Sequence, residues 1–213
     1  MDPKKLTVFG ASAVAGQGLR PGEKTFAHIV AEHFNLQLKI VALPGASNHW
    51  LLRQIKIHCD ENPKDFILVN WQTEDRDEWQ DSAGKYHQIT AHSLNLPAEF
   101  KERYQQWVLS LTEQRLDELK QAWHDNIFTL HNQLNNSKIK HLFFNYMYSL
   151  RKPKQTIDWH NSFVGPYDNN SSWYWYLVNC CGIQADEWYH FKQDGHEAWA
   201  EFLINYIQSN NLL

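Results

Sequence analysis

The sequence predicts an α/β domain in which an open, mostly parallel sheet is covered by helices on both faces. Three observations support this class: short continuous apolar runs, stretches of helical periodicity between them, and Gly or Pro where the runs end. Continuous apolar runs are typical of strands covered on both faces, as in parallel sheets. Their alternation with helices favours a layered α/β architecture. The 213 residues suit one domain, which we expect to span residues 1–213.

The strands and the first helices follow from apolar patterning. We expect strands at residues 6–9, 37–43, 66–69 and 139–145. Helices are expected at residues 26–34 and 51–59, where apolar side chains repeat on one face. Ser47 or Asn48 can cap the second of these helices.

The remaining segments are less regular. Residues 77–96 are polar and are interpreted as a loop or lid, whereas residues 98–135 have helical periodicity and form two helices or one bent helix. The aromatic-rich segment 172–178 is expected to be helical. The last helix is expected to start near Asp194, which with Glu197 has the spacing of a capping box.

Composition excludes several classes of protein. The formal net charge is −4, and the only basic patch, at residues 151–154, is too short for a phosphate-binding stripe, so we expect no nucleic-acid partner. No apolar stretch approaches the roughly 20 residues that span a bilayer, and no signal-peptide pattern is visible. We therefore expect a cytoplasmic protein with no membrane partner.

Cysteine usage gives no sign of a disulfide framework. There are three cysteines, and two of them, Cys180 and Cys181, are adjacent, with no Cys-x-x-Cys spacing. We expect neither a metal nor a cofactor.

In an open parallel sheet, ligands bind beyond the carboxyl ends of the strands. The turns to inspect are therefore residues 10–20, 44–49 and 70–79. Ser12 follows the first strand directly, so its side chain is expected to project into the cleft, where it can act as a nucleophile or merely cap a turn. If a helix follows soon after, its free N–H groups point at whatever Ser12 attacks.

The segment 186–200 places carboxylates ahead of a histidine, just before the last helix. A carboxylate can orient an imidazole, which can then take a proton from a serine. The segment resembles the last block of SGNH/GDSL hydrolases, with Asp-x-x-His followed by a Gly-His pair. The resemblance places His190 on the catalytic histidine. Glu187 occupies the carboxylate position by spacing, and Asp186, one residue earlier, is its competitor.

Two further blocks resemble the same family. Gly10-Ala11-Ser12 resembles the first block, with Ala11 in place of its usual aspartate. Pro44-Gly45-Ala46-Ser47-Asn48 resembles the second, which implies that the N–H of Gly45 helps to hold an oxyanion. Asn48 is a further candidate for this oxyanion or substrate site.

The third block departs from the family pattern. Gln72-Thr73-Glu74-Asp75 stands where the family has Gly-x-Asn-Asp, so Glu74 replaces the oxyanion-binding asparagine. An ionised carboxylate cannot donate a hydrogen bond. Thr73, Gln72 or Arg76 can substitute as donors, and Arg76 is the preferred candidate because a guanidinium offers several N–H groups and a permanent charge.

The resemblance implies a three-layer α/β/α, flavodoxin-like fold with a lid or loop insertion around residues 77–96. It also implies a serine esterase that acts on a small-molecule or carbohydrate ester, such as an acetylated sugar or a short acyl ester. The altered third block and Ala11 keep an alternative open, an SGNH-fold binding or accessory protein with little turnover. The sequence does not indicate the oligomeric state.

Simpler interpretations compete at individual positions. Residues 74–78 are equally compatible with a solvated charged loop. His190 and His196 lack a third ligand for a metal, and His196 is expected to be structural. Residues 173–176 are expected to belong to the core in preference to a sugar-stacking platform.

Overall fold

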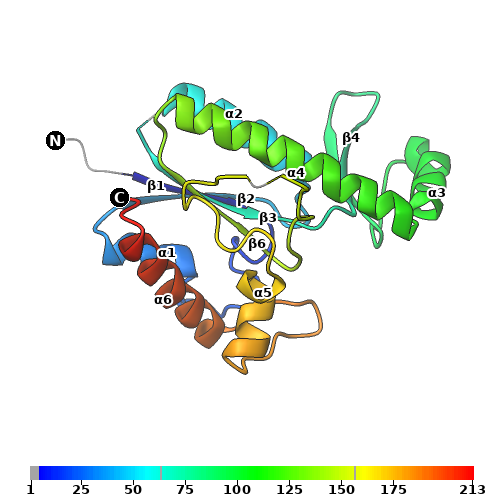
Figure 1. Ribbon diagram of the computed structural model, residues 1–213. Coiled ribbons are helices and arrows are strands. Elements are labelled where there is room, and N and C mark those ends of the chain that lie inside the picture. The colour runs from blue at the N-terminus through cyan, green and yellow to red at the C-terminus, as the bar shows by residue number, and fades with distance from the viewer. Residues whose placement is uncertain (1–4, 63, 156) are drawn as a thin grey trace.

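The computed structural model describes residues 5–62, 64–155 and 157–213. Its centre is a four-stranded sheet (Figure 1). The strands are β1 (Lys5–Gly10), β2 (Gln37–Ala42), β3 (Phe66–Trp71) and β6 (His141–Asn145), in the order β2-β1-β3-β6. All three pairings are parallel. The predicted strands and their common direction are confirmed.

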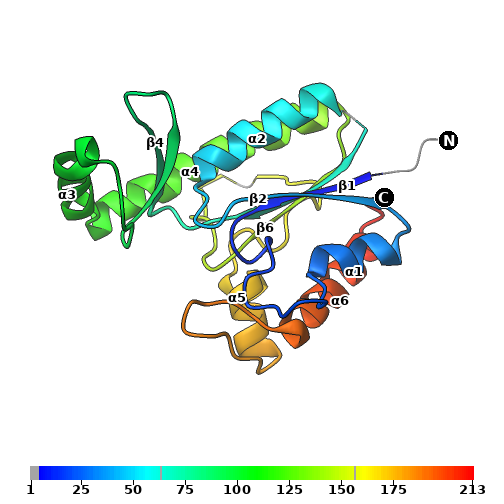
Figure 2. The same ribbon diagram turned by 180° about the vertical axis from the view of Figure 1, so that it is seen from behind.

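Helices cover both faces of this sheet, as Figures 1 and 2 show. On one side lie α1 (Phe26–His33), α5 (Trp173–Trp175) and α6 (Gln193–Ser209), and on the other lie α2 (Asn48–Glu61) and α4 (Glu113–Asn136). Successive strand residues point to opposite faces and so belong to two separate cores. Leu68 packs on the side of α1 and α6, and Val69 packs on the side of α2 and α4. The predicted fold class, a parallel sheet between two helical layers, is confirmed.

The long helical segment is divided into two helices. A short 3-10 turn, η1 (Ala98–Phe100), leads into α3 (Lys101–Ser110), and α4 begins at Glu113. Thr112 caps α4 by accepting a hydrogen bond from the N–H of Arg115 (3.3 Å). This cap ends the ambiguity between two helices and one bent helix.

The polar segment expected as a loop contains a β-hairpin. β4 (Arg76–Gln80) and β5 (Tyr86–Thr90) pair antiparallel, and the hairpin projects from the body beside α3 (Figures 1 and 2). Its core is small: Trp79 and Ile89 are buried against Phe100. One buried apolar residue in each five-residue strand is too weak a pattern to predict a strand, because the surrounding residues are polar.

The capping box expected at the last helix is absent. α6 begins at Gln193, and its N-cap residue, Lys192, makes no side-chain cap. Asp194 therefore lies inside the first turn, where its carboxylate accepts from the N–H of Gly195 (2.9 Å), while Glu197 accepts from Gln193 (2.9 Å). Asp194 still faces the free N–H groups of the helix start, where a negative charge is favourable.

The C-terminal third is otherwise built from short turns. These are η2 (Asn169–Ser171), α5, and the π-helical turn η3 (Tyr176–Cys180). Within the described ranges, no helix combines the length and the hydropathy needed to cross a bilayer.

Two buried histidines, His131 of α4 and His141 at the start of β6, are in contact. The Nδ1 of His141 donates to the carbonyl of Ile139 (2.9 Å), which leaves its Nε2 to accept from Nδ1 of His131 (2.9 Å). The Nε2 of His131 in turn faces Asn135 Nδ2 (2.9 Å). All four ring nitrogens therefore have a hydrogen-bond partner while both imidazoles are neutral. Burial lowers the pKa of both histidines to about 4.

This pair predicts loss of stability in mild acid. The unfolded chain binds protons on both rings below pH 6.5, whereas the folded chain keeps them neutral until about pH 4. The free energy of unfolding should therefore fall as the pH drops from 6.5 towards 4, by about 1.4 kcal/mol for each pKa unit between the two states. Urea unfolding across this range measures it. A slope that persists in full in a His131→Asn, His141→Asn variant would contradict the assignment.

Candidate functional site

A cleft of about 440 Å³ lies where the turns after β1 and β2 meet the hairpin and the loop before α6. It is lined by Ser12, Gln17, Gly45, Arg76, Thr90, Trp188 and His190. The structure therefore brings four of the candidates from the sequence, Ser12, Gly45, Arg76 and His190, to one place.

Ser12 and His190 are in direct contact although 178 positions separate them. Ser12 Oγ lies 2.9 Å from Nε2 of His190. The distance is that of a hydrogen bond between a hydroxyl and an imidazole. This pair has the geometry of a nucleophile and its base.

The backbone beside Ser12 forms an irregular turn, with no regular helix. The N–H of Ala15 donates to the carbonyl of Ala11 (3.0 Å), but α1 begins only at Phe26. The helix N-terminus that the sequence allowed immediately after Ser12 is therefore absent. In the part of the chain that is described, the N–H groups of Ser12 and Gly45 have no protein acceptor. Both are free to bind an anionic oxygen at the cleft.

A glycine lets the N-terminal turn approach the histidine closely. Gly18 has a φ of +95°, and a Cβ on it would lie 2.6 Å from the carbonyl oxygen of Phe191 and 2.9 Å from Cβ of His190. A side chain at this position would push the two segments apart. The absence of one at Gly18 keeps His190 beside the turn that carries Ser12.

The loop that carries His190 is held by its own hydrogen bonds. The carboxylate of Asp186 accepts from the N–H groups of Trp188 (2.9 Å) and His190 (2.8 Å). The hydroxyl of the buried Tyr146, just beyond β6, donates to the carbonyl of Tyr189. These contacts fix the loop, and with it the imidazole, at the edge of the sheet.

The same geometry decides which carboxylate faces the imidazole. Asp186 Oδ1 lies 3.8 Å from Nδ1 of His190, while Glu187 is exposed and has no polar contact within the described residues. The preference for Glu187 from spacing is therefore corrected in favour of Asp186. The reason is the tight reversal of the loop, in which Tyr189 has a φ of +64°. The reversal turns Asp186, four positions before His190, back towards the imidazole.

The charge state of His190 is set by its burial and by two charged neighbours. Burial lowers its pKa below the ordinary value, Asp186 raises it, and the guanidinium of Arg76 lowers it. The net direction is downward. The imidazole is therefore neutral, and able to accept a proton, at neutral pH.

Arg76, the first residue of β4, reaches the cleft from the hairpin. Its Nη1 donates to the carbonyl of Ala46 (3.3 Å), which follows Gly45. Burial lowers the pKa of the guanidinium, and nearby Asp75 raises it. Glu74, the residue in the asparagine position of the third block, pairs with Lys120 (3.4 Å) and not with Arg76.

The acidic residues that follow are also engaged. Glu78 pairs with Arg53 of α2 (2.7 Å), and Asp77 accepts from the indole N–H of Trp79 (2.8 Å). The interpretation of residues 74–78 as a merely solvated loop is therefore wrong. The pair of Glu78 with Arg53 docks the hairpin on α2.

Two of the remaining candidates do not reach the cleft as free donors. Asn48 is 2% exposed, and both ends of its amide bind the backbone of Gln72, at 3.0 Å and 2.8 Å. Asn48 thus ties the start of α2 to the end of β3, and it does not line the cleft. Thr73 is half-buried and does not line the cleft. Of the two candidate donors, Thr73 and Arg76, Arg76 is the one that lines the cleft.

His196 has a structural contact, as expected. It is fully buried, and its Nδ1 accepts a hydrogen bond from the N–H of Phe26 (3.1 Å). Burial lowers its pKa to about 4. The bond joins the first turn of α6 to the first turn of α1.

Sequence reasoning missed three residues of the cleft. Thr90 lies in the segment interpreted as a loop, and Gln17 lies in the turn after Ser12. Trp188 is 71% exposed, although it stands between Asp186 and His190. The aromatic side chain that the cleft offers to solvent is thus Trp188, whereas Trp173, at the start of the 173–176 segment, is fully buried.

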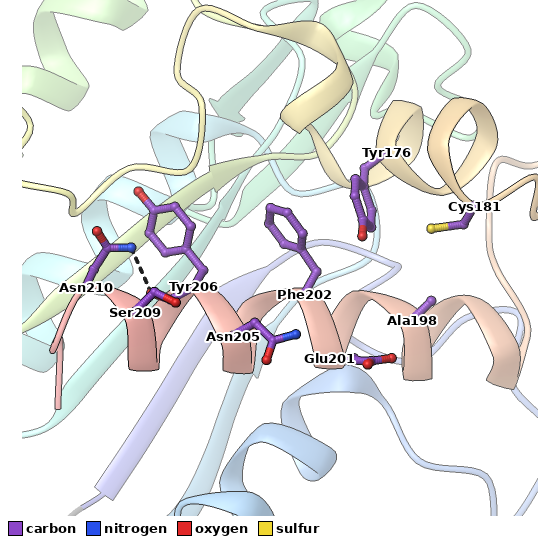
Figure 3. A pocket seen from close by; sticks show the side chains of 9 residues that line it. All are labelled: Tyr176, Cys181, Ala198, Glu201, Phe202, Asn205, Tyr206, Ser209 and Asn210. Atoms are coloured by element: carbon purple, nitrogen blue, oxygen red, sulfur yellow. Dashed lines mark hydrogen bonds between the residues drawn. The ribbon is translucent and has the colours of Figure 1, made fainter.

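A second hollow, of about 420 Å³, lies between α6 and the segment of η3 (Figure 3). Its aromatic lining is Tyr176, Phe202 and Tyr206, with Glu201 and Asn205 at its edge. None of the candidates from the sequence lines it. Of these two hollows, the Ser12 cleft is the one in which a hydroxyl lies beside an imidazole.

Comparison with known proteins supports the fold. No family model and no curated protein matches this chain. Among solved structures, it is similar to a two-domain esterase active on acetylated mannans, with 12% identity and a TM-score of 0.51 over 97% of this chain and 49% of that one. This chain spans about half the length of that esterase.

Two further structures are covered almost entirely. One is the psychrotrophic esterase EstA from Pseudoalteromonas sp., with 9% identity, a TM-score of 0.50 and coverage of 97% of both chains. The other is a catalytic mutant of Axe2, an acetylxylan esterase from Geobacillus stearothermophilus, with 11% identity, a TM-score of 0.47 and coverage of 97% and 95%. At such identities the likeness to the mannan esterase and to EstA concerns the fold.

The role of Gly18 can be tested with a matched control. Gly18 and Gly22 have similar φ values, +95° and +90°, but a Cβ at Gly22 meets nothing within 4 Å. Gly22→Ala should cost only the roughly 1–2 kcal/mol of left-handed backbone strain. Gly18→Ala should lower the free energy of unfolding further and separate His190 from Ser12, seen as a changed imidazole pKa in NMR titration. Equal effects of the two variants would show that the close approach does not matter.

Proposed function

We propose that the protein is a serine ester hydrolase of the SGNH type, with residues 1–213 acting as one domain and residues 77–96 as its insertion. The observation that carries the proposal is the 2.9 Å contact between Ser12 Oγ and His190 Nε2 in an open cleft. Asp186, 3.8 Å from the other imidazole nitrogen, is the orienting carboxylate of the proposed triad.

The reaction follows from this arrangement. Ser12 Oγ attacks the carbonyl carbon of the ester while its proton moves to Nε2 of His190. The imidazolium then protonates the leaving alkoxide as the ester C–O bond breaks, which leaves an acyl-enzyme. Water adds to the acyl carbon and gives a proton to His190. The acid departs as that proton returns to Ser12 Oγ.

The oxyanion of each tetrahedral intermediate needs hydrogen-bond donors. The N–H groups of Ser12 and Gly45, which have no protein acceptor in the described residues, are two such donors. The third is Arg76, which replaces the asparagine that the third block lacks. Losing one such donor typically costs about 2.7–4 kcal/mol of transition-state stabilisation, so this replacement matters for turnover.

The substrate in this proposal is an ester of a small molecule or a carbohydrate, such as an acetylated sugar or a short acyl ester. Trp188 supports a carbohydrate, because an exposed aromatic face beside the nucleophile offers a stacking surface to a sugar ring. The first of the similar structures is an esterase active on acetylated mannans, which agrees with this class.

A second candidate function is a binding or accessory protein with little turnover. The observation that favours it is the 3.8 Å separation of Asp186 from His190 Nδ1, which exceeds hydrogen-bond distance. The Asp186 carboxylate is instead bound to two backbone N–H groups. Closure on a substrate is required for this carboxylate to orient the imidazole strongly.

Labelling and turnover separate the two candidates. The wild-type protein should react with a fluorophosphonate probe and hydrolyse short acyl esters, because Ser12 is activated by His190. Ser12→Ala should abolish labelling and lower turnover at least a thousandfold while leaving the melting temperature almost unchanged. Peptide mapping of the labelled protein identifies the modified serine. An unlabelled wild type that is inactive on acetylated sugars and short esters would favour the binding protein.

The pH profile identifies the orienting carboxylate. His190 must be neutral to act as a base, so kcat/KM should fall on the acid side along a limb whose midpoint lies below 6.5. Asp186→Asn removes the charge that raises this pKa, so the limb should move to lower pH and kcat should fall about a hundredfold. Glu187→Gln is the matched control and should leave both unchanged. Small and equal losses in the two variants would mean that neither residue orients His190.

A further inference from the structure

Arg76 gives the cleft a charge opposite to that of the whole chain. The formal net charge of the protein is −4, yet the residues that line the cleft in the described chain include no carboxylate. His190 is neutral at neutral pH, since its pKa is lowered. The guanidinium of Arg76 is therefore the formal charge that a bound substrate meets there.

This guanidinium is not matched by an ion pair within the described residues. Its Nη1 donates to the carbonyl of Ala46, which is a neutral acceptor. Asp75 is the carboxylate whose charge acts on this guanidinium. Asp75 is close enough to raise the pKa of Arg76 but does not pair with it within 4.0 Å, and Asp186 is turned towards His190 and its own loop. Glu74 and Glu78 are paired with Lys120 and Arg53.

The donor count leaves room for a second acceptor. A guanidinium has five N–H groups in a planar fork. One is used by Ala46, and the proposed oxyanion needs one more, which leaves three. The oxyanion exists only during the reaction, whereas the cost of holding a cation in a partly buried position applies at all times. A carboxylate on the substrate offsets that cost throughout the bound state, before and after the oxyanion exists.

We propose that the preferred substrates are esters that also carry a carboxylate, held by the planar fork of Arg76 beside Ser12. The inference rests on the proposed hydrolase function and narrows its substrate class. A carboxylate is favoured over a neutral acceptor because two parallel N–H groups of a guanidinium match its two oxygens. Trp188 and Thr90 form the neighbouring walls on which the rest of such a molecule lies.

The carboxylate can stand on either side of the ester bond, so the experiment has two arms. In the first arm it lies on the alcohol side, and acetylated glucuronic acid is compared with acetylated glucuronamide. In the second arm it lies on the acyl side, and the monosuccinyl ester of glucose is compared with its terminal amide. In each arm the two compounds differ in charge and hardly in shape, and kcat/KM is measured for each.

The expected result is a kcat/KM at least tenfold higher for the acid than for its amide in one of the two arms. Arg76→Gln should bring this ratio close to one, whatever its effect on overall turnover. Arg76→Lys should keep part of the ratio, because it retains the charge and loses the fork. Arg115→Gln is the control: it changes the net charge equally, and within the described residues the ion pair of Arg115 is with Glu118 on the exposed surface of α4.

The outcomes separate the inference from the proposed function. Equal rates for acid and amide in both arms overturn the inference and leave the hydrolase intact. If the protein neither hydrolyses these esters nor reacts with a fluorophosphonate probe, the hydrolase fails, and calorimetry with glucuronate and glucuronamide tests the inference alone. Tighter binding of glucuronate that Arg76→Gln removes supports a carboxylate site, and equal binding of both compounds overturns it.

Discussion

The arrangement of the cleft depends on one buried hydrogen bond, from the N–H of Phe26 to Nδ1 of His196. It holds the start of α6 against the start of α1, and stacking of Phe26 on His196 and of Trp173 on Trp199 reinforces it. Since His190 lies only six positions before His196, this anchor determines where the loop that carries the imidazole can lie. The parallel sheet supplies the other half of the constraint, because β1 delivers Ser12 to the same edge.

Asp186 makes two kinds of contact at the cleft, one with the backbone of its own loop and one with the imidazole. Its carboxylate accepts two backbone N–H groups, which stabilises the loop, and it is also the acid that faces the imidazole. An acceptor shared in this way orients the ring less strongly than a dedicated one. Arg76 acts in the opposite sense on the same ring, because its charge lowers the pKa that Asp186 raises. The basicity of His190 is thus a balance between one residue on its own loop and one on the hairpin.

The sequence predicted the sheet, its two helical layers and the meeting of Ser12 with His190, because each follows from strong patterns: continuous apolar runs and a distinctive terminal block. The hairpin was not predictable, since Trp79 and Ile89 are isolated apolar residues in a polar segment. Spacing alone favoured Glu187. The loop reversal that brings Asp186 to the imidazole depends on the positive φ of Tyr189, and a tyrosine gives no sign of such a conformation in the sequence. Asn48 has the chemistry of a ligand donor, and only its bonds to Gln72 show that it is already committed.

The docking of the hairpin on α2 has a consequence for how such a protein can diversify. The hairpin meets the body through a few polar bridges, from Gln88 to the N–H of Ser47, from Glu78 to Arg53 and from Arg76 to Ala46. Ser12 and His190 are held by other elements, the sheet edge and the start of α6. The wall of the cleft and its reactive pair therefore rest on separate supports. A replaced or lengthened hairpin that keeps Arg76 can change which molecules fit the cleft while Ser12 and His190 keep their positions, so this segment can vary independently of that pair.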